Sequence, residues 1–357
     1  MVGRSLTDRF PNREPHVGEV CFEVKDWCVD HPVFDGIKVC DHINFNLRRG
    51  EVLGISGLMG AGRTELAMSI FGHSYGANIR GHIYKNGKEV SFPNVKSAIK
   101  AGLAYVTEDR KGNGLILTES ICKNTTAAKP EKISNHYILD FDKERKYSEE
   151  MAKEMHTKCA SVMEDVGNLS GGNMQKVLLG KWLFAEPEIL ILDEPTSGLD
   201  PNQVEDVRNI IREIGKTRTV IVSTHILSEV ETICSRAIII SSGKVVADSP
   251  IEELKERFGH ELSVNITVGG GSFDDISAAI KAVSGVDSVT QSADNNTEIE
   301  NAISIHVSVN GSAEIRPALC KAITEKGYDL YEVSMQRNSL EDVFHALTTA
   351  NGEEEGK

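Results

Sequence analysis

The spacing of apolar residues along the chain predicts short strands that alternate with helices. Apolar and polar residues alternate at 20–24 and 43–47, which is typical of antiparallel strands with one buried face. From Glu51 onward the pattern changes to short apolar runs separated by stretches with helical spacing. These runs predict strands at residues 52–55, 103–106, 189–192, 220–223 and 237–240. The alternation predicts an α/β fold in which helices cover a mostly parallel sheet.

Residues 112–175 interrupt this alternation. They are largely polar, with helical spacing at residues 142–158, and we predict that they form an inserted helical subdomain. The whole of residues 19–258 is predicted to be one domain, closed by a short helix at 250–258. Residues 1–18 are polar and contain two prolines, so they predict a linker-like N-terminal arm.

A second domain is predicted after Gly259, where the composition changes. The pattern predicts strands at 262–268, 288–292, 303–309 and 331–336, and helices at 273–283 and 315–326. The resulting order, βαββαβ, is that of a ferredoxin-like α+β domain spanning residues 259–350. Residues 351–357 form an acidic tail, which we expect to be frayed.

Charge and cysteine content narrow the functional classes. The chain has 39 basic and 53 acidic residues, a net charge of −14, which argues against nucleic-acid binding because that needs clustered Lys and Arg. No apolar run reaches the roughly 18 residues that cross a bilayer. The seven cysteines are scattered without a C-x-x-C pair, which favours reduced thiols over disulfides or a zinc site. We therefore expect a cytosolic protein.

The first motif with chemical content is a glycine-rich loop after the apolar run at 52–55 and before a helical stretch. In that context glycines let the backbone wrap around phosphate groups, so that several N–H groups point inward. The start of the helix adds a favourable positive end for an anion. Taken alone, the motif is also compatible with an ordinary glycine-rich turn. Its residues are Gly57, Leu58, Met59, Gly60, Ala61, Gly62, Arg63 and Thr64.

Two residues at the end of this loop bear directly on its chemistry. The hydroxyl of Thr64 is a candidate ligand for Mg²⁺. Arg63 occupies the position at which a phosphate-binding loop has Lys. Arginine keeps the positive charge but spreads it over a wider planar group, so the exchange is not conservative. We expect nucleotide binding to survive this exchange and hydrolysis to be slow.

The second motif is the apolar run at 189–192, which ends in two carboxylates. Asp193 is positioned to hold Mg²⁺ through water, and Glu194 to orient or deprotonate the attacking water. By itself, an apolar strand that ends in acidic residues is common on protein surfaces. Beside the phosphate-binding loop, the pair predicts phosphoryl-transfer chemistry.

The third motif is a run of small and polar residues that opens a helix, where backbone N–H groups form an anion-binding nest. It consists of Leu169, Ser170, Gly171, Gly172, Asn173 and Gln175, with Met174 between the last two. Together the three motifs resemble those of the ABC ATPase family, and the resemblance spans roughly residues 20–258. It implies a P-loop NTPase of ABC type, with a mixed sheet core and a helical subdomain, that uses ATP and Mg²⁺.

The resemblance also implies how the motifs work together. In that family two ATPase domains pack head to tail, and each ATP lies between one P-loop and the partner's signature motif, so Ser170, Gly171 and Gly172 correspond to residues that contact the γ-phosphate in the other subunit. His225 corresponds to the histidine that contacts the γ-phosphate. The loop that communicates across the dimer corresponds to Ser197, Gly198, Leu199 and Asp200.

Two further residues match the ABC ATPase family less closely. Phe34 occupies the place at which the family stacks an aromatic ring on adenine, although a core phenylalanine is an equal alternative. Glu108 falls where most members have Gln. A glutamine amide both donates and accepts, whereas an ionised glutamate only accepts. Glu108 is a candidate catalytic residue and a further candidate ligand for Mg²⁺.

The resemblance can be narrowed, and it then divides the chain. Residues 1–196 resemble the second ATPase half of tandem sugar-importer ATPases for ribose, galactose or xylose, in which the stretch around Met1 lies mid-chain. Residues 197–357 resemble exporter-type ATPases of the gliding-motility class. We interpret this as a fusion of two lineages near residues 194–196, either natural or from sequence assembly.

The predicted function is an ATP-hydrolysing subunit that energises transport, with carbohydrate import favoured and export as an alternative. The expected partners are membrane permease subunits, a second ABC ATPase domain in a homodimer or heterodimer, and a periplasmic or extracellular substrate-binding protein reached through the permease. The expected location is the inner face of the cell membrane. A nucleotide-binding regulatory module with little hydrolysis is the other alternative, supported by Arg63.

Overall fold

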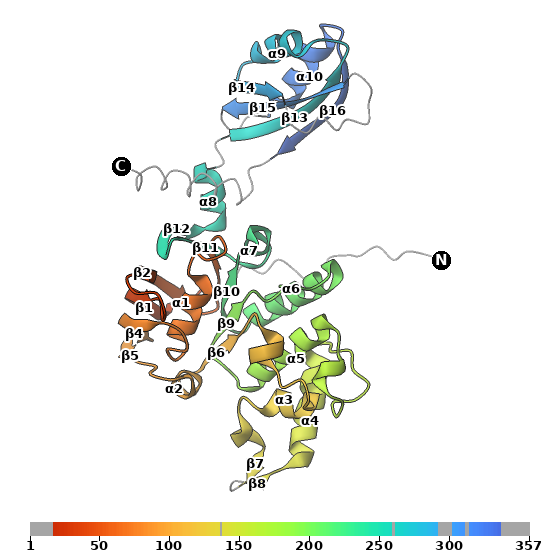
Figure 1. Ribbon diagram of the computed structural model, residues 1–357. Helices are drawn as coiled ribbons and strands as arrows, with labels where there is room; N and C mark the ends of the chain where they lie inside the picture. Colours follow the sequence, from red (N-terminus) through yellow and green to blue (C-terminus); the bar gives the residue numbers. More distant parts are fainter. Residues whose placement is uncertain (1–16, 136–137, 259–260, 292–301, 311–313, 337–357) are drawn as a thin grey trace. The chain divides into compact units, whose positions relative to one another are not determined.

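The computed structural model describes residues 17–135, 138–258, 261–291, 302–310 and 314–336 (Figure 1). Most of the predicted N-terminal arm and the whole acidic tail lie outside the described residues. The chain divides into two compact units, Met1–Asp248 and Ser249–Lys357, which are described separately below. The boundary between the units follows Asp248, which is earlier in the chain than the domain boundary predicted after residue 258.

An antiparallel sheet begins the first unit. Its order is β2-β1-β4-β5, formed by Lys38–Arg48, Val20–Asp30, Ala77–Lys85 and Lys88–Val90. Val24 of β1 lies opposite Phe45 of β2, and both side chains are buried in the core. The alternating pattern at 20–24 and 43–47 therefore predicted these strands and their pairing correctly.

A parallel sheet forms the centre of the first unit. Its order is β12-β11-β3-β10-β9-β6, formed by Lys244–Pro250, Arg236–Ser241, Val52–Ser56, Thr219–Thr224, Ile189–Asp193 and Leu103–Val106. The pairs from β11 through β6 are all parallel. Residues of β6, β9 and β10 are buried throughout, which explains why these strands have continuous apolar runs.

Strands of this sheet are followed by three helices of the first unit, α1 (Arg63–Ile70), α6 (Pro201–Gly215) and α7 (Leu227–Ile233), and its strand β6 is preceded by α2 (Val95–Lys100). The Asp200 carboxylate accepts a hydrogen bond from Gln203 N–H, which satisfies a backbone donor at the start of α6. Pro201 at the first helical position supplies the backbone angle that a helix start requires.

The predicted helical subdomain is present between β6 and β9. It contains η1 (Arg110–Gly114), α3 (Ile121–Thr126), η2 (Pro130–Ile133), the strand pair β7 (Ser134–Asn135) and β8 (Ile138–Leu139), α4 (Phe141–Glu154), η3 (Val166–Asn168) and α5 (Gly171–Phe184). Figure 1 shows α3, α4 and α5 packed side by side. The helix predicted at 142–158 ends earlier, at Glu154, because His156 adopts a left-handed conformation with φ of 50° that a helix cannot continue.

The second unit contains helix α8 (Ile251–Phe258) and the predicted βαββαβ arrangement. The strands β13 (Glu261–Gly269), β14 (Val286–Gln291), β15 (Ala302–Asn310) and β16 (Asp329–Gln336) form a sheet in the order β14-β15-β13-β16. All its described pairs are antiparallel, and α9 (Phe273–Lys281) and α10 (Arg316–Thr324) pack against it (Figure 1). The ferredoxin-like topology is confirmed.

Within the described part of the chain, none of the helices is both long enough and apolar enough to span a membrane.

Candidate functional site at the carboxyl edge of the parallel sheet

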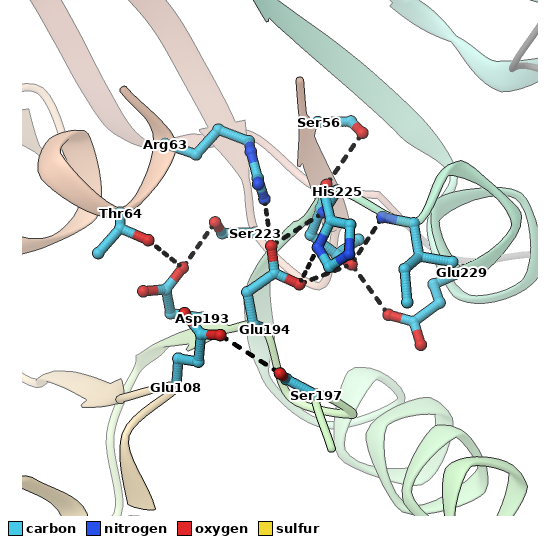
Figure 2. A network of polar contacts seen from close by, with 12 residues as sticks. Ser56, Arg63, Thr64, Glu108, Asp193, Glu194, Ser197, Ser223, His225 and Glu229 are labelled. Carbon is cyan, nitrogen blue, oxygen red and sulfur yellow. Dashed lines mark hydrogen bonds and ion pairs between the residues drawn. The ribbon is translucent and has the colours of Figure 1, made fainter. Parts of the chain in front are cut away.

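The candidate residues meet because parallel strands end at the same edge of a sheet. Ser56, the last residue of β3, pairs in register with Thr224 of β10, and Ser223 pairs with Asp193 of β9. The segments that follow these strands therefore begin side by side. They carry the glycine-rich loop, Glu194 and His225, three elements that are far apart in the sequence (Figure 2).

The glycine-rich loop is built so closely against its neighbours that two of its glycines have no room for a side chain. A Cβ on Gly57 would lie 2.3 Å from the carbonyl oxygen of Ile240. A Cβ on Gly62 would lie 2.2 Å from the carbonyl oxygen of Val39, and Gly62 also has a φ of 99°. Leu58 and Met59 at the tip of the loop are 59% and 83% exposed, whereas Ala61 is buried.

Asp193 is fully buried at the end of β9 and accepts three hydrogen bonds. The hydroxyls of Ser223 and Thr64 donate to Oδ1 over 2.8 Å and 3.2 Å, and the Tyr105 hydroxyl donates to Oδ2 over 2.8 Å. Burial, reinforced by the Asp193 charge, raises the pKa of Tyr105 far above its ordinary value, so Tyr105 remains a donor. The hydroxyl of Thr64 and the carboxylate of Asp193 thus place hard oxygen ligands together, the kind that Mg²⁺ prefers.

Glu194 has two cationic or basic neighbours. Arg63 Nη1 lies 2.6 Å from Oε1, and His225 Nδ1 lies 2.9 Å from Oε2. The backbone N–H of His225 also donates to Oε1 over 3.0 Å. Burial opposes ionisation of Glu194, but the hydrogen bonds from His225 and Arg63 outweigh it and hold the pKa of Glu194 below its ordinary value. Glu194 is therefore an ionised carboxylate with both oxygens engaged (Figure 2).

Arg63 was expected to face the phosphates, and the structure places its guanidinium on Glu194. The side chains of Arg63 and Glu194 are only 7% and 6% exposed. Arg63 Nε is buried and has no hydrogen-bond partner among the described residues. A buried, partly unsatisfied guanidinium is costly, so a further acceptor at this position would be favourable.

The network continues to residues that the sequence analysis did not identify. The Thr224 hydroxyl lies 3.2 Å from Glu194 Oε2 and 3.1 Å from Oε2 of Glu229, which is buried at the start of α7. Arg208 Nη2 lies 3.5 Å from Glu229 Oε1, and the Thr196 hydroxyl also contacts that oxygen. Through the Thr224 hydroxyl, these residues extend the hydrogen-bond network of Glu194. Glu229 lies on the buried side of α7, but the sequence does not reveal its contacts with Arg208 and Thr196.

Glu108 lies after β6 and is directed toward the predicted dimer loop. Its Oε1 accepts a hydrogen bond from the Ser197 hydroxyl over 3.3 Å. Arg110, two residues later, donates to the backbone oxygens of Ser197 and Gly198 over 2.8 Å and 3.3 Å. Leu199 packs against the core. The segment after β6 is thus joined to the loop before α6.

The residues of the third motif lie at the start of α5. Ser170 is the N-cap, and its hydroxyl accepts hydrogen bonds from Asn173 N–H over 3.4 Å and from Asn173 Nδ2 over 3.0 Å. Gly171 is half-buried, while Gly172 and Gln175 are buried. In the part of the chain that the structure describes, no hydrogen bond or ion pair joins this motif to the glycine-rich loop. One chain by itself does not bring the two together.

Phe34 is 60% exposed in the turn between β1 and β2. Its ring lies 4.7 Å from the ring of His31, and its backbone N–H donates to His31 Nδ1 over 3.1 Å. The exposure rules out the alternative of a core phenylalanine. Its predicted contact with adenine stays a prediction.

Comparison with known proteins agrees with this geometry. Residues 40–197 match the family model described as ABC transporter. The L-arabinose transport ATP-binding protein of Geobacillus stearothermophilus is 51% identical over 258 residues, which is 72% of this chain and 50% of that protein. A xylose import ATP-binding protein of Thermoanaerobacter pseudethanolicus is 42% identical over 259 residues, 72% of this chain and 51% of that protein.

Solved structures support the fold. A dimeric, post-hydrolysis structure of an ATP-binding cassette bound to ADP and Pi superposes with a TM-score of 0.56 at 19% identity, covering 64% of this chain and 98% of that chain. A nucleotide-free ATP-binding cassette from an ABC transporter gives a TM-score of 0.57 at 20% identity, covering 67% of this chain and 94% of that chain.

The fold and the site define the class: this chain contains an ABC transporter ATP-binding domain. Within that class its relatives are sugar-importer ATPases, as the resemblance of residues 1–196 predicted. The chain spans about half the length of these relatives. The matched stretch of 258 residues is longer than 196 residues, so the similarity continues past Thr196. The exporter resemblance of residues 197–357 stays a prediction.

Proposed function

We propose that this chain is an ATP-binding and ATP-hydrolysing subunit that energises carbohydrate import through a membrane permease. The observation that carries the proposal is the assembly of Asp193, Glu194 and His225 beside the glycine-rich loop at one sheet edge. The names of its relatives supply the substrate class, because L-arabinose and xylose are both pentoses.

In this proposal the chain's own groups bind the triphosphate and activate water. The backbone N–H groups of the loop from Gly57 to Thr64 face the phosphates. Glu194, kept ionised, accepts a hydrogen bond from the attacking water, and His225 holds that carboxylate in place. Because phosphoryl transfer depends on positioning and electrostatics, these fixed groups account for most of the expected rate enhancement.

Mg²⁺ fits the oxygen atoms that meet between Thr64 and Asp193. Thr64 Oγ1 and Asp193 Oδ1 lie 3.2 Å apart, and hydrogen bonds from the hydroxyls of Tyr105 and Ser223 fix the Asp193 carboxylate. A bound Mg²⁺ would neutralise charge on the phosphates. Glu108 is a further candidate ligand, although its contact with Ser197 directs it toward the predicted dimer loop.

We propose that the working unit is a dimer. Ser170, Gly171 and Gly172 form a helix start with no partner in the glycine-rich loop of the same chain, within the described residues. A second copy, or a related domain, would bring its own helix start to the phosphates, since such starts favour anions. A related ATP-binding cassette has been solved as a dimer with ADP and Pi.

The permease is expected to dock on the side of the helical subdomain. A cavity of about 480 Å³ lies there, lined by residues of α1, α5 and the segment after β6, including Thr64, Asp193, Glu108 and Lys181. A partner that contacts Glu108 and Lys181 at this cavity would lie next to the residues proposed to hold Mg²⁺, which would provide a direct physical connection. A substrate-binding protein would act through that permease.

ATP turnover by the purified chain, measured with and without the co-expressed permease, tests this function. We expect Mg²⁺-dependent hydrolysis that is nearly abolished by Glu194→Gln and that co-purified permease stimulates. Wild-type turnover equal to that of Glu194→Gln would contradict the proposal.

A second candidate function is a nucleotide-binding module that regulates a partner with little hydrolysis. The contact of Arg63 with Glu194 favours it, because that ion pair occupies the carboxylate that must receive the water proton. ATP binding without measurable turnover, with and without permease, would support this second function.

A further inference from the structure

A second group of chemically active side chains lies in the antiparallel sheet, outside the nucleotide site. The carboxylate of Asp26, the sulfur of Cys28 and a ring nitrogen of His42 all lie within 4.8 Å of one another. Asp26 and Cys28 belong to β1, and His42 belongs to the neighbouring strand β2. Oxygen, sulfur and imidazole nitrogen are the three ligand types that Zn²⁺ takes in proteins.

The backbone is distorted where these side chains meet. The pairing of β1 with β2 shifts between Val24 and Trp27, and its pairing with β4 shifts between Lys25 and Cys28. Asp26 and His42 both adopt left-handed conformations, with φ of 52° and 54°, a region that few non-glycine residues enter and that aspartate and histidine enter more readily than most. Bulges of this kind re-aim side chains and concentrate at functional positions.

A neighbouring glycine lets β4 fit against this distortion. A Cβ on Gly81 would lie 2.6 Å from the carbonyl oxygen of Asp26 and 2.8 Å from Cα of Trp27. The bulge is therefore packed into the sheet and is not a loose edge.

Hydrogen bonds from neighbouring groups hold Asp26, Cys28 and His42 close together. The side chain of Asn44 accepts a hydrogen bond from Asp26 N–H over 2.9 Å and donates one to the His42 carbonyl over 2.7 Å. The backbone N–H of His42 donates to Cys28 Sγ over 3.3 Å. One amide thus fixes the backbones of two ligand residues, and such outer partners orient the ligands of metal sites.

We propose that Asp26, Cys28 and His42 form a Zn²⁺ site that ties β1 to β2. Cys28 Sγ, one Asp26 oxygen and one His42 ring nitrogen would bind the ion, with water in the fourth position. Binding releases the Cys28 thiol proton to solvent and involves no change in oxidation state. The direct contact between Asp26 and His42 opens to admit the ion, which is feasible because their side chains are 65% and 62% exposed.

The site is independent of the proposed ATPase function. It lies on β1 and β2, the two strands that the turn carrying Phe34 connects. Its expected effect is to stabilise this pair of strands, since an ion that binds only the folded state raises stability by mass action.

Cobalt substitution tests the proposal. The full-length chain is freed of metal with a chelator, saturated with Mg²⁺ to fill oxygen-ligand sites, and titrated with Co²⁺ followed by Zn²⁺. We expect a thiolate-to-cobalt charge-transfer band that saturates at one ion per chain and disappears when Zn²⁺ is added. Zn²⁺ should also raise the unfolding temperature.

Three variants separate this site from other thiols. Cys28→Ser should abolish the band. His42→Gln, a change at an exposed side chain, should weaken Co²⁺ binding by more than about tenfold, because even outer-shell changes cost about ten- to a hundredfold. Cys159→Ser, a half-buried thiol of the helical subdomain, should leave the band unchanged. A wild-type chain without the band, or a band that survives both Cys28→Ser and His42→Gln, overturns the proposal.

Discussion

At the scale of single residues, the chemistry centres on the pair formed by Arg63 and Glu194. In the nucleotide site, burial makes each of the two charges depend on the other, since a buried charge without a partner is strongly unfavourable. His225 is a second partner for Glu194. In the proposed site, a phosphate that attracted Arg63 would loosen its hold on Glu194, which would couple nucleotide binding to activation of the water through one guanidinium.

Replacing Arg63 with Lys should raise turnover. The compact ammonium group of lysine forms fewer fixed hydrogen bonds with a carboxylate and binds phosphate as a point charge, so Glu194 is released more easily. We expect Arg63→Lys to increase ATP turnover by about tenfold, or about 1.4 kcal/mol in the activation free energy. Arg63→Gln, which lacks the charge, is the control and should lower nucleotide affinity. Equal turnover of Arg63→Lys and the wild type would refute this role.

The ionised state of Glu194 predicts a pH dependence of stability. Its folded-state pKa lies below the ordinary value of 4.5, so its contribution is fully present above pH 4.5 and is lost as the pH falls through the lower folded-state pKa. Glutamine cannot titrate. Denaturant unfolding of wild type and Glu194→Gln should thus show a free-energy difference that is largest above pH 4.5 and shrinks in more acidic solution. A difference that is constant with pH would argue against this ionised state.

At the scale of elements, the structure explains which parts of the site the sequence could predict. Asp193, Glu194 and His225 directly follow apolar runs, and parallel strands necessarily end at one edge, so their convergence was predictable. Glu229 was not predictable, because its role depends on how helix α7 packs against Arg208 and Thr196, a contact between distant segments. The ion pair of Arg63 with Glu194 was not predicted for the same reason.

The secondary structure also contains some features that the sequence predicts and others that it does not. Strands with long apolar runs, such as 103–106 and 189–192, were predicted almost to the residue because continuous burial leaves a strong pattern. The predicted helix at 142–158 extended too far, because its polar sequence contains no signal for the left-handed turn at His156. The bulge at Asp26 and the small strand pair β7–β8 also left no signal that the spacing could reveal.

Arg110 provides a testable connection between two elements. It lies in η1 and donates to the backbone oxygens of Ser197 and Gly198 in the loop before α6. Arg110→Ala removes both hydrogen bonds and should destabilise that loop by about 1.5–3 kcal/mol, the usual range for a hydrogen bond that involves a charged group. We expect turnover to fall several-fold while ATP affinity of the glycine-rich loop changes little. A loss of affinity as large as the loss of turnover, measured by titration and steady-state kinetics, would contradict this connection.

At the scale of the whole molecule, the residues of the proposed ATP site lie at two separate places in one chain. The glycine-rich loop and the carboxylates meet at the sheet edge, whereas Ser170 and Gly171 lie at the start of α5. A two-fold dimer in which each copy lends this helix start to the other would complete two equivalent sites. The central claim is therefore that an ATP site contains residues of two chains.

Mixing two inactive variants tests this claim most directly. Glu194→Gln removes the carboxylate at the water, and Gly171→Asp places a negative charge where the partner's phosphates are expected. A Cβ at Gly171 would lie 3.3 Å from Nη2 of Arg110, the end of a flexible side chain that can move aside. In a random one-to-one mixture, about a quarter of the sites combine an intact Glu194 with an intact Gly171. We predict that the mixture regains roughly that share of wild-type ATP turnover, while each variant alone stays inactive. A mixture no more active than its separate components would contradict the account.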